Sequence, residues 1–120
     1  MFNKEMRHHN TKRKFGRETN QRKALMKSLA VNLIKNDKIK TTEAKAKELR
    51  PFIEKLVTKA KGGDLAKRRI VASVIGILST KKLFDKIAPK YKDRNGGYTR
   101  ITKMPRRKTD GSKISIIEFV

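Results

Sequence analysis

The side chains that could do acid–base or metal chemistry are few in this chain, and their spacing argues against a catalytic site. The only two histidines, His8 and His9, are adjacent, and there is no cysteine. Neighbouring imidazoles alone do not make the coordination shell that a metal ion needs. Carboxylates such as Glu43, four residues before Lys47, have the spacing of an ion pair on a solvated helix face. We therefore expect no enzyme, no cofactor or metal, and no small-molecule substrate.

Gly96 and Gly97 are the other candidate, because glycine-rich loops can cradle phosphate groups. The pair lacks the GxxxxGK[ST] and GxGxxG spacings of phosphate-binding loops. A bare glycine pair is better explained by a turn that needs a positive φ or by the close approach of another backbone. We expect a turn here.

Arginine and lysine are the residues that cluster. The 120-residue chain has 33 Lys and Arg against 11 Asp and Glu, a formal net charge of +22. Self-repulsion of this size opposes compactness and favours a polyanionic partner, and arginine suits phosphate because its planar fork donates two hydrogen bonds at once. The candidate RNA-binding residues are Arg7, His8, His9, Lys12, Arg13, Lys14, Arg17, Arg22 and Lys23 in a first group, Arg68 and Arg69 in a second, and Arg94, Arg100, Lys103, Arg106, Arg107 and Lys108 in a third.

Aromatic residues near these cations offer a second mode of RNA contact. Phe15, the histidine pair and Tyr98 could stack on unpaired bases, an effect of about 1–3 kcal/mol per base. For Tyr98, a place in the hydrophobic core is an equal alternative.

Two other classes of protein fit a strongly basic composition. A free nucleic-acid architectural protein would need a dimer surface or a recognition helix, and the sequence has neither signature. A membrane-surface protein is the other class, but the amphipathic stripes are needed for the core. The longest apolar run, residues 70–78, is far shorter than the roughly 20 residues of a bilayer span. The first residues lack the apolar region of a secretory signal. We expect a soluble intracellular protein without membrane contact.

Two regions follow from the distribution of apolar residues. Residues 1–18 have little apolar content and six Lys or Arg, which predicts a basic extended arm. Residues 19–120 predict a single α/β domain, which is the default number of domains for this length.

Helical periodicity predicts four helices in the second region. The first begins at a cap at Thr19 or Asn20 and stops at Asn36 and Asp37. The second follows an N-cap at Thr42 and ends at Gly62 and Gly63, with a kink or a break before Pro51. The third follows a cap at Asp64 and has a buried stripe from Ile70 to Leu78. The fourth is capped by Ser79 or Thr80, and Pro89 opens a distorted last turn.

Alternating apolar residues predict three strands, at residues 38–42, 98–103 and 113–120. The last two should form an antiparallel hairpin with an Asp-Gly turn. The final strand is apolar on both faces, which is typical of the middle of a small sheet. The fold class is therefore α+β, in the order α-β-α-α-α-β-β.

Several segments resemble the family of the bacterial large-subunit ribosomal protein numbered seventeen. They are MRH at residues 6–8, NQRKALMKSLAVNLI at 20–34, IKTTEAKAKELR at 39–50, KLF at 82–84, RNGGYTRI at 94–101 and IEFV at 117–120.

This resemblance implies a structural component of the large ribosomal subunit in the bacterial cytoplasm. It implies binding to large-subunit ribosomal RNA near the exit of the polypeptide tunnel, with neighbouring large-subunit ribosomal proteins as further partners. The family fold is a two-layer α/β domain with a small mixed sheet, in which residues 38–42 lie beside a C-terminal strand. By position, the RNA contacts would involve residues 7–17, Arg22, and the hairpin around Arg100 and Arg106.

Overall fold

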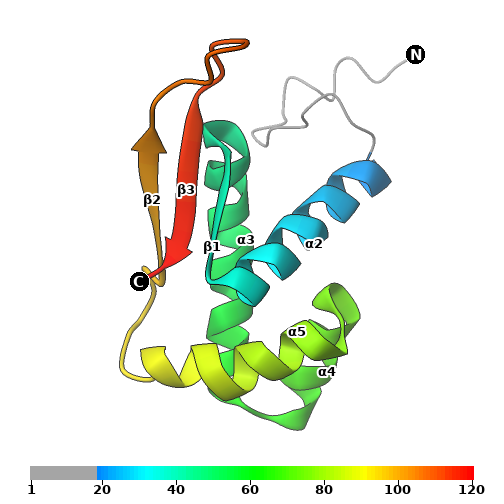
Figure 1. Ribbon diagram of the computed structural model, residues 1–120. Coiled ribbons are helices and arrows are strands. Elements are labelled where there is room, and N and C mark those ends of the chain that lie inside the picture. The colour runs from blue at the N-terminus through cyan, green and yellow to red at the C-terminus, as the bar shows by residue number, and fades with distance from the viewer. Residues whose placement is uncertain (1–18) are drawn as a thin grey trace, which may run out of the picture.

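The computed structural model describes residues 19–120 (Figure 1). The predicted arm, residues 1–18, and the candidate residues within it lie outside this part. The predicted order of elements and the α+β class are confirmed. The elements are α2 (Thr19–Asn36), β1 (Lys38–Thr42), α3 (Glu43–Gly62), α4 (Leu65–Ile75), α5 (Ile77–Lys82), a π-helical turn (Leu83–Ile87), a 3₁₀ turn (Ala88–Tyr91), β2 (Thr99–Met104) and β3 (Ile114–Phe119).

The three strands form a sheet in the order β1-β3-β2, so β3 lies in the middle as its two apolar faces predict. Ile117 of β3 lies opposite Ile39 of β1 and Ile101 of β2. The mixed sheet that the family resemblance implied is wrong, because both strand pairs are antiparallel. The strands β1 and β2 do run in the same direction, but β3 separates them and no parallel pair forms.

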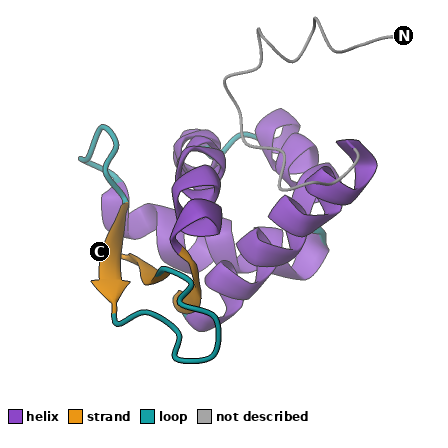
Figure 2. Ribbon diagram, turned by 90° about the horizontal axis from the view of Figure 1, so that it is seen from above, coloured by secondary structure: helices purple, strands orange, loops and turns teal. Residues whose placement is uncertain are grey.

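The helices pack on one face of this sheet, with α3 directly against all three strands. Figure 2 shows the strands gathered at one side of the molecule. Ile117 is fully buried between sheet and helices, and α3 contributes Leu49, Ile53 and Val57, which are also fully buried. On the opposite face of the sheet, side chains such as Thr102 are exposed, and no helix of the described part covers them. We call this the open face.

The ends of α3 follow from local chemistry, as predicted. The Thr42 Oγ1 accepts a hydrogen bond from the Lys45 N–H at 3.3 Å, and Gly63 ends the helix in the left-handed region with a φ of 69°. Of the two alternatives predicted before Pro51, the break is wrong, because α3 continues through it as one helix, and the kink near residues 47–50 stays a prediction. Pro51 is exposed on the solvent side, and Leu49 and Ile53, two residues away on either side, belong to one core cluster, whose packing offsets the lost hydrogen bond.

The boundary between the third and fourth predicted helices is also wrong. Gly76 ends α4 with a φ of 87°, and α5 begins directly after it. Ser79 and Thr80 therefore lie inside α5 rather than before it, and the Thr80 hydroxyl donates to the Gly76 carbonyl at 2.6 Å. The chain changes direction at Gly76, so the stripe that periodicity extends to Leu78 leaves the core. Leu78, which follows Gly76, is 85% exposed, and Ile70, within α4, also lies outside the core at 49% exposed.

No helix within residues 19–120 is both long enough and apolar enough to cross a bilayer.

Candidate nucleic-acid interface

The positive charge of the described fold is mostly not cancelled within it. The first 18 residues hold six of the 33 Lys and Arg and two of the 11 acids, which leaves 27 and nine in residues 19–120. Six of those nine carboxylates form ion pairs with six different cations, so 21 Lys and Arg pair with no carboxylate of the same range. The paired cations are Lys47, Arg50, Arg68, Lys82, Arg100 and Arg107.

The third candidate group lies mainly on β2 and on the loop that joins it to β3, residues 105–113, here called the hairpin loop. This loop lies at one end of the molecule (Figure 1). Arg100 is on the open face, opposite Glu118 of β3. Its Nε and Nη2 donate to the same Glu118 oxygen at 3.2 and 3.0 Å. No residue of the described part accepts from the remaining three N–H donors of this guanidinium.

The hairpin loop carries four cations and one acid, and its own hydrogen bonds hold it in shape. The Gly111 N–H donates to the Arg107 carbonyl at 2.8 Å, and the Arg107 N–H donates to the Ser112 carbonyl at 2.9 Å. Asp110 accepts from the Ser112 N–H at 3.1 Å and from the Arg107 guanidinium at 3.2 Å. The Ser112 N–H is the main reason that the pKa of Asp110 is lowered. Arg106 donates to the Gly111 carbonyl at 3.1 Å.

Lys103 and Lys108 complete this group in different places. Successive side chains of a strand alternate between faces, so Lys103 points away from the open face that carries Arg100. It lies near the start of α3, where the pKa of Glu43 is lowered, first by a hydrogen bond from Lys47 and also by the charge of Lys103. Lys108 is exposed on the hairpin loop.

The structure does not bring all three candidate groups together. Arg22 is partly buried and Lys23 is exposed at the start of α2, toward the same end of the molecule as the hairpin loop (Figure 1). In contrast, Arg68 and Arg69 are on α4, at the opposite end. Arg94 precedes the glycine pair, at the far end of β2 from the hairpin loop.

Arg68 has local partners that explain its place. Its Nη1 is 3.9 Å from the Asp85 Oδ1, and its guanidinium lies 5.2 Å from the centre of the Phe84 ring. This residue therefore ties α4 to the π-helical turn. The second candidate group is separate from the third.

Tyr98 belongs to the core, so the prediction that its ring stacks on RNA bases is wrong. It is 1% exposed, and its hydroxyl lies 3.3 Å from the Thr58 hydroxyl and accepts from the Lys61 ammonium at 3.1 Å. The turn predicted at the glycine pair is confirmed, since φ is 128° at Gly96 and 64° at Gly97. The two glycines redirect the chain so that Tyr98 enters the core.

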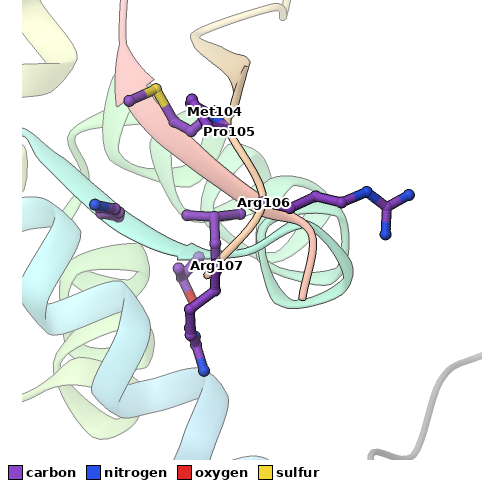
Figure 3. A pocket seen from close by; sticks show the side chains of 7 residues that line it. Met104, Pro105, Arg106 and Arg107 are labelled. Atoms are coloured by element: carbon purple, nitrogen blue, oxygen red, sulfur yellow. The ribbon is translucent and has the colours of Figure 1, made fainter. Parts of the chain in front are cut away.

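A cavity of about 540 Å³ lies where the sheet meets the hairpin loop, and sequence reasoning missed it (Figure 3). We call it the sheet-end cavity. Its walls come from three segments that only the pairing of β1 and β2 with β3 brings together, so a local pattern could not reveal it. The residues that line it are Lys40 and Thr41 from β1, Met104 from β2, Pro105, Arg106 and Arg107 from the hairpin loop, and Ile114 from β3.

Metal chemistry has no support in the described part. Within residues 19–120, no three His, Cys, Asp or Glu side chains gather in a way that could hold a metal ion.

Comparison with known proteins identifies the family. Residues 25–120 match the family model described as Ribosomal protein L17. The chain belongs to this family. The L17 match includes every described strand and all of the helices except the first residues of α2. The resemblance seen in the sequence is therefore confirmed.

Individual L17 relatives match over nearly the whole chain. The large ribosomal subunit protein bL17 of Hydrogenobaculum sp. (strain Y04AAS1) is 52% identical over 117 residues, which cover 96% of this chain and 99% of the relative. The protein of the same name from Clostridium acetobutylicum is 50% identical, over 90% of this chain and 96% of the relative. That from Sphingopyxis alaskensis is 52% identical, over 96% of this chain and 84% of the relative.

Proposed function

We propose that this chain is a structural, non-enzymatic constituent of the large ribosomal subunit in the bacterial cytoplasm, where it binds large-subunit ribosomal RNA. The L17 relatives carry the name of a large-subunit protein, which supports the assembly. The observation that carries the RNA contact is the uncancelled charge of the described fold, with 21 Lys and Arg that pair with no carboxylate of residues 19–120. A dense array of phosphates is the partner that removes this repulsion.

The mechanism is electrostatic placement on folded RNA. Lysine and arginine replace condensed counterions on the phosphates, and the release of those counterions drives binding. The hairpin loop contributes cations whose backbone is already fixed, so little conformational entropy is lost there on binding. The basic residues of the predicted arm and the start of α2 extend the same interface, and the third group supplies Arg100 and its neighbours.

Contacts with other proteins of the subunit are the second part of the proposal. Ile77 and Leu78 of α5 are 79% and 85% exposed, and aliphatic surface of this kind suits an apolar protein neighbour better than phosphate. A position near the exit of the polypeptide tunnel is what membership of the family favours.

The first test is where the protein travels and how its RNA binding depends on salt. We expect it to sediment with the large subunit in a sucrose gradient. If about eight phosphates are contacted, log affinity for large-subunit RNA should fall against log salt with a slope of about −6 to −7. A slope near −1 (about one phosphate) would contradict the proposal. Sedimentation away from the subunit would instead favour a free architectural protein.

The second test concerns residues 1–18. Because they contain six Lys and Arg, their deletion should weaken incorporation into the subunit. The circular dichroism of the remaining chain should change little. Loss of the folded body in this deletion would contradict the idea that the arm and the body are separate units.

A further inference from the structure

We infer that the sheet-end cavity takes one unpaired nucleotide of the bound RNA. Its base would lie against Met104, Pro105 and Ile114, and its phosphate among the cations at the rim. This inference rests on the proposed function, because it assigns a subsite within the RNA interface.

The floor of the cavity is apolar. Met104 and Ile114 lie directly opposite each other on β2 and β3, and both side chains are on the open face. Ile114 is 6% exposed and Met104 is partly buried, while Pro105 is exposed beside them. Such a floor offers no favourable contact to a phosphate, whereas the flat face of a base can pack against it. The volume of about 540 Å³ lies within the range of ligand-binding clefts.

The rim of the cavity is cationic. Lys40 of β1 is exposed and pairs with no carboxylate of residues 19–120. Figure 3 shows the Arg106 side chain extending away from Met104 and Pro105, which puts its guanidinium at the outside of the cavity. One of its five donors is bound to the Gly111 carbonyl, and four remain for phosphate. The cavity therefore combines apolar and cationic lining residues, which suit the base and the phosphate of a nucleotide.

The occupant must be an unpaired nucleotide rather than a duplex. In an A-form helix the base faces are buried in the stack, and a protein meets phosphates and 2′-hydroxyl groups. Only a nucleotide in a loop, bulge or end can turn its base into a cavity. The hydrogen bonds of the hairpin loop keep the cavity open before RNA arrives, which lowers the entropic cost of filling it.

The test uses two pairs of single variants of the full chain, each with a control on the same strand and the same face. Met104→Ala shortens the floor without changing charge, and Thr102→Ala is its control outside the cavity. Lys40→Gln removes a rim charge, and Lys38→Gln is its control. Binding to the complete large-subunit RNA is measured at several salt concentrations. The 2′-hydroxyl reactivity of each nucleotide is mapped in every complex.

We expect Met104→Ala to weaken binding by about fivefold, at the low end for a base contact because the floor has no aromatic ring. Its salt slope should stay that of the unmodified chain. The reactivity of one unpaired nucleotide should change, and Lys40→Gln should change the same nucleotide. Neither control should affect that nucleotide. Thermal melts followed by circular dichroism check that Met104→Ala is folded. If Met104→Ala does not fold, Lys40→Gln still tests the inference, because Lys40 is exposed and its substitution should not disturb the fold.

Three outcomes overturn the inference. In the first, the cavity variants and their controls have equal affinities and equal reactivity maps. If the unmodified chain still shows its steep salt slope, that outcome would leave the proposed function intact. Another is loss of subunit incorporation with no change at any nucleotide, which would indicate a protein segment in the cavity. The third is failure of the unmodified chain to bind the RNA, which removes the proposed function and this subsite together.

Discussion

The hairpin loop offers the sharpest test of electrostatic binding, because the structure distinguishes its paired cation from its unpaired ones. Arg107 forms an ion pair with Asp110, but Arg106 and Lys108 pair with no carboxylate of the described part. The variant Arg106→Gln/Lys108→Gln therefore removes two charges that no carboxylate of residues 19–120 neutralises. Removing Arg107 would instead leave Asp110 as a repulsive charge beside the RNA.

The expected size of the effect follows from counterion release. Each phosphate contact contributes about 0.7 to 0.9 to the salt slope, so two lost contacts make it shallower by about 1.4 to 1.8. Over a fourfold rise in salt concentration, the ratio of the affinity of the unmodified chain to that of the variant should then fall by about seven- to twelvefold. Binding to large-subunit RNA is measured at low protein concentration, from about 50 mM to about 200 mM salt.

The matched control removes the same charge from the other end of the molecule. Lys86 and Lys90 are exposed on the turns after α5, and Lys86→Gln/Lys90→Gln also lowers the net charge by two. Its salt slope should stay close to that of the unmodified chain. All four positions are exposed, so the stability of either double variant should change by less than about 0.5 kcal/mol per substitution. Equal slopes for the two double variants would refute a specific role for the hairpin loop.

Three further predictions concern the fold that positions the interface. The carboxylate of Asp64 caps α4 by accepting a hydrogen bond from a backbone N–H at 2.7 Å. Asp64→Ala should therefore lower the free energy of unfolding, measured in urea, by about 1 kcal/mol, whereas the control Asp93→Ala should have little effect. Ile117→Ala leaves a cavity at a fully buried site in the central strand of the sheet and should lower the free energy of unfolding by about 2–5 kcal/mol. Ile116→Ala, on the open face, should lower it much less. The pKa of Asp110 is lower in the folded than in the unfolded protein. The carboxylate therefore stabilises the fold at pH values above its unfolded pKa, and this stabilisation is lost as the pH falls through its folded pKa. An NMR titration of the loop amides should therefore show a midpoint below the ordinary value of about 3.9, and a midpoint at or above it would contradict the bracing of the loop.

Much of the fold could be predicted because it depends on neighbouring residues in the chain. The cap at Thr42 and the left-handed Gly63 set the ends of α3, and each acts within one turn of the helix. The two apolar faces of β3 predict its central place for a similar reason. Gly76 was missed because a glycine within an apolar run is compatible with a continuous helix. Only the observed φ of 87° shows the change of direction.

The site was predicted less completely, because it depends on contacts between distant segments. The sequence indicates that the third group is cationic, but not that Glu118 already holds Arg100. That contact requires the register of β2 against β3. Lys40 was not predicted at all, since a single lysine in a five-residue strand has no local feature that separates it from a solvated charge. It becomes part of a site only when β1 pairs with β3 and places it beside the hairpin loop.

Two carboxylates of the hairpin and its loop act as local braces rather than as a counterweight to the charge of the described part. Asp110 holds Arg107 within the hairpin loop, and Glu118 holds Arg100 across two strands. These pairs are at least partly exposed, and each contributes at most about 1 kcal/mol to stability. Their effect is geometric, because they fix where arginines point while leaving most lysines and arginines unneutralised. A fold that orders its cations in this way suits the phosphates of the RNA partner that we propose. Because repulsion among the remaining cations opposes folding, the free protein should become measurably more stable when salt or a polyanion is added.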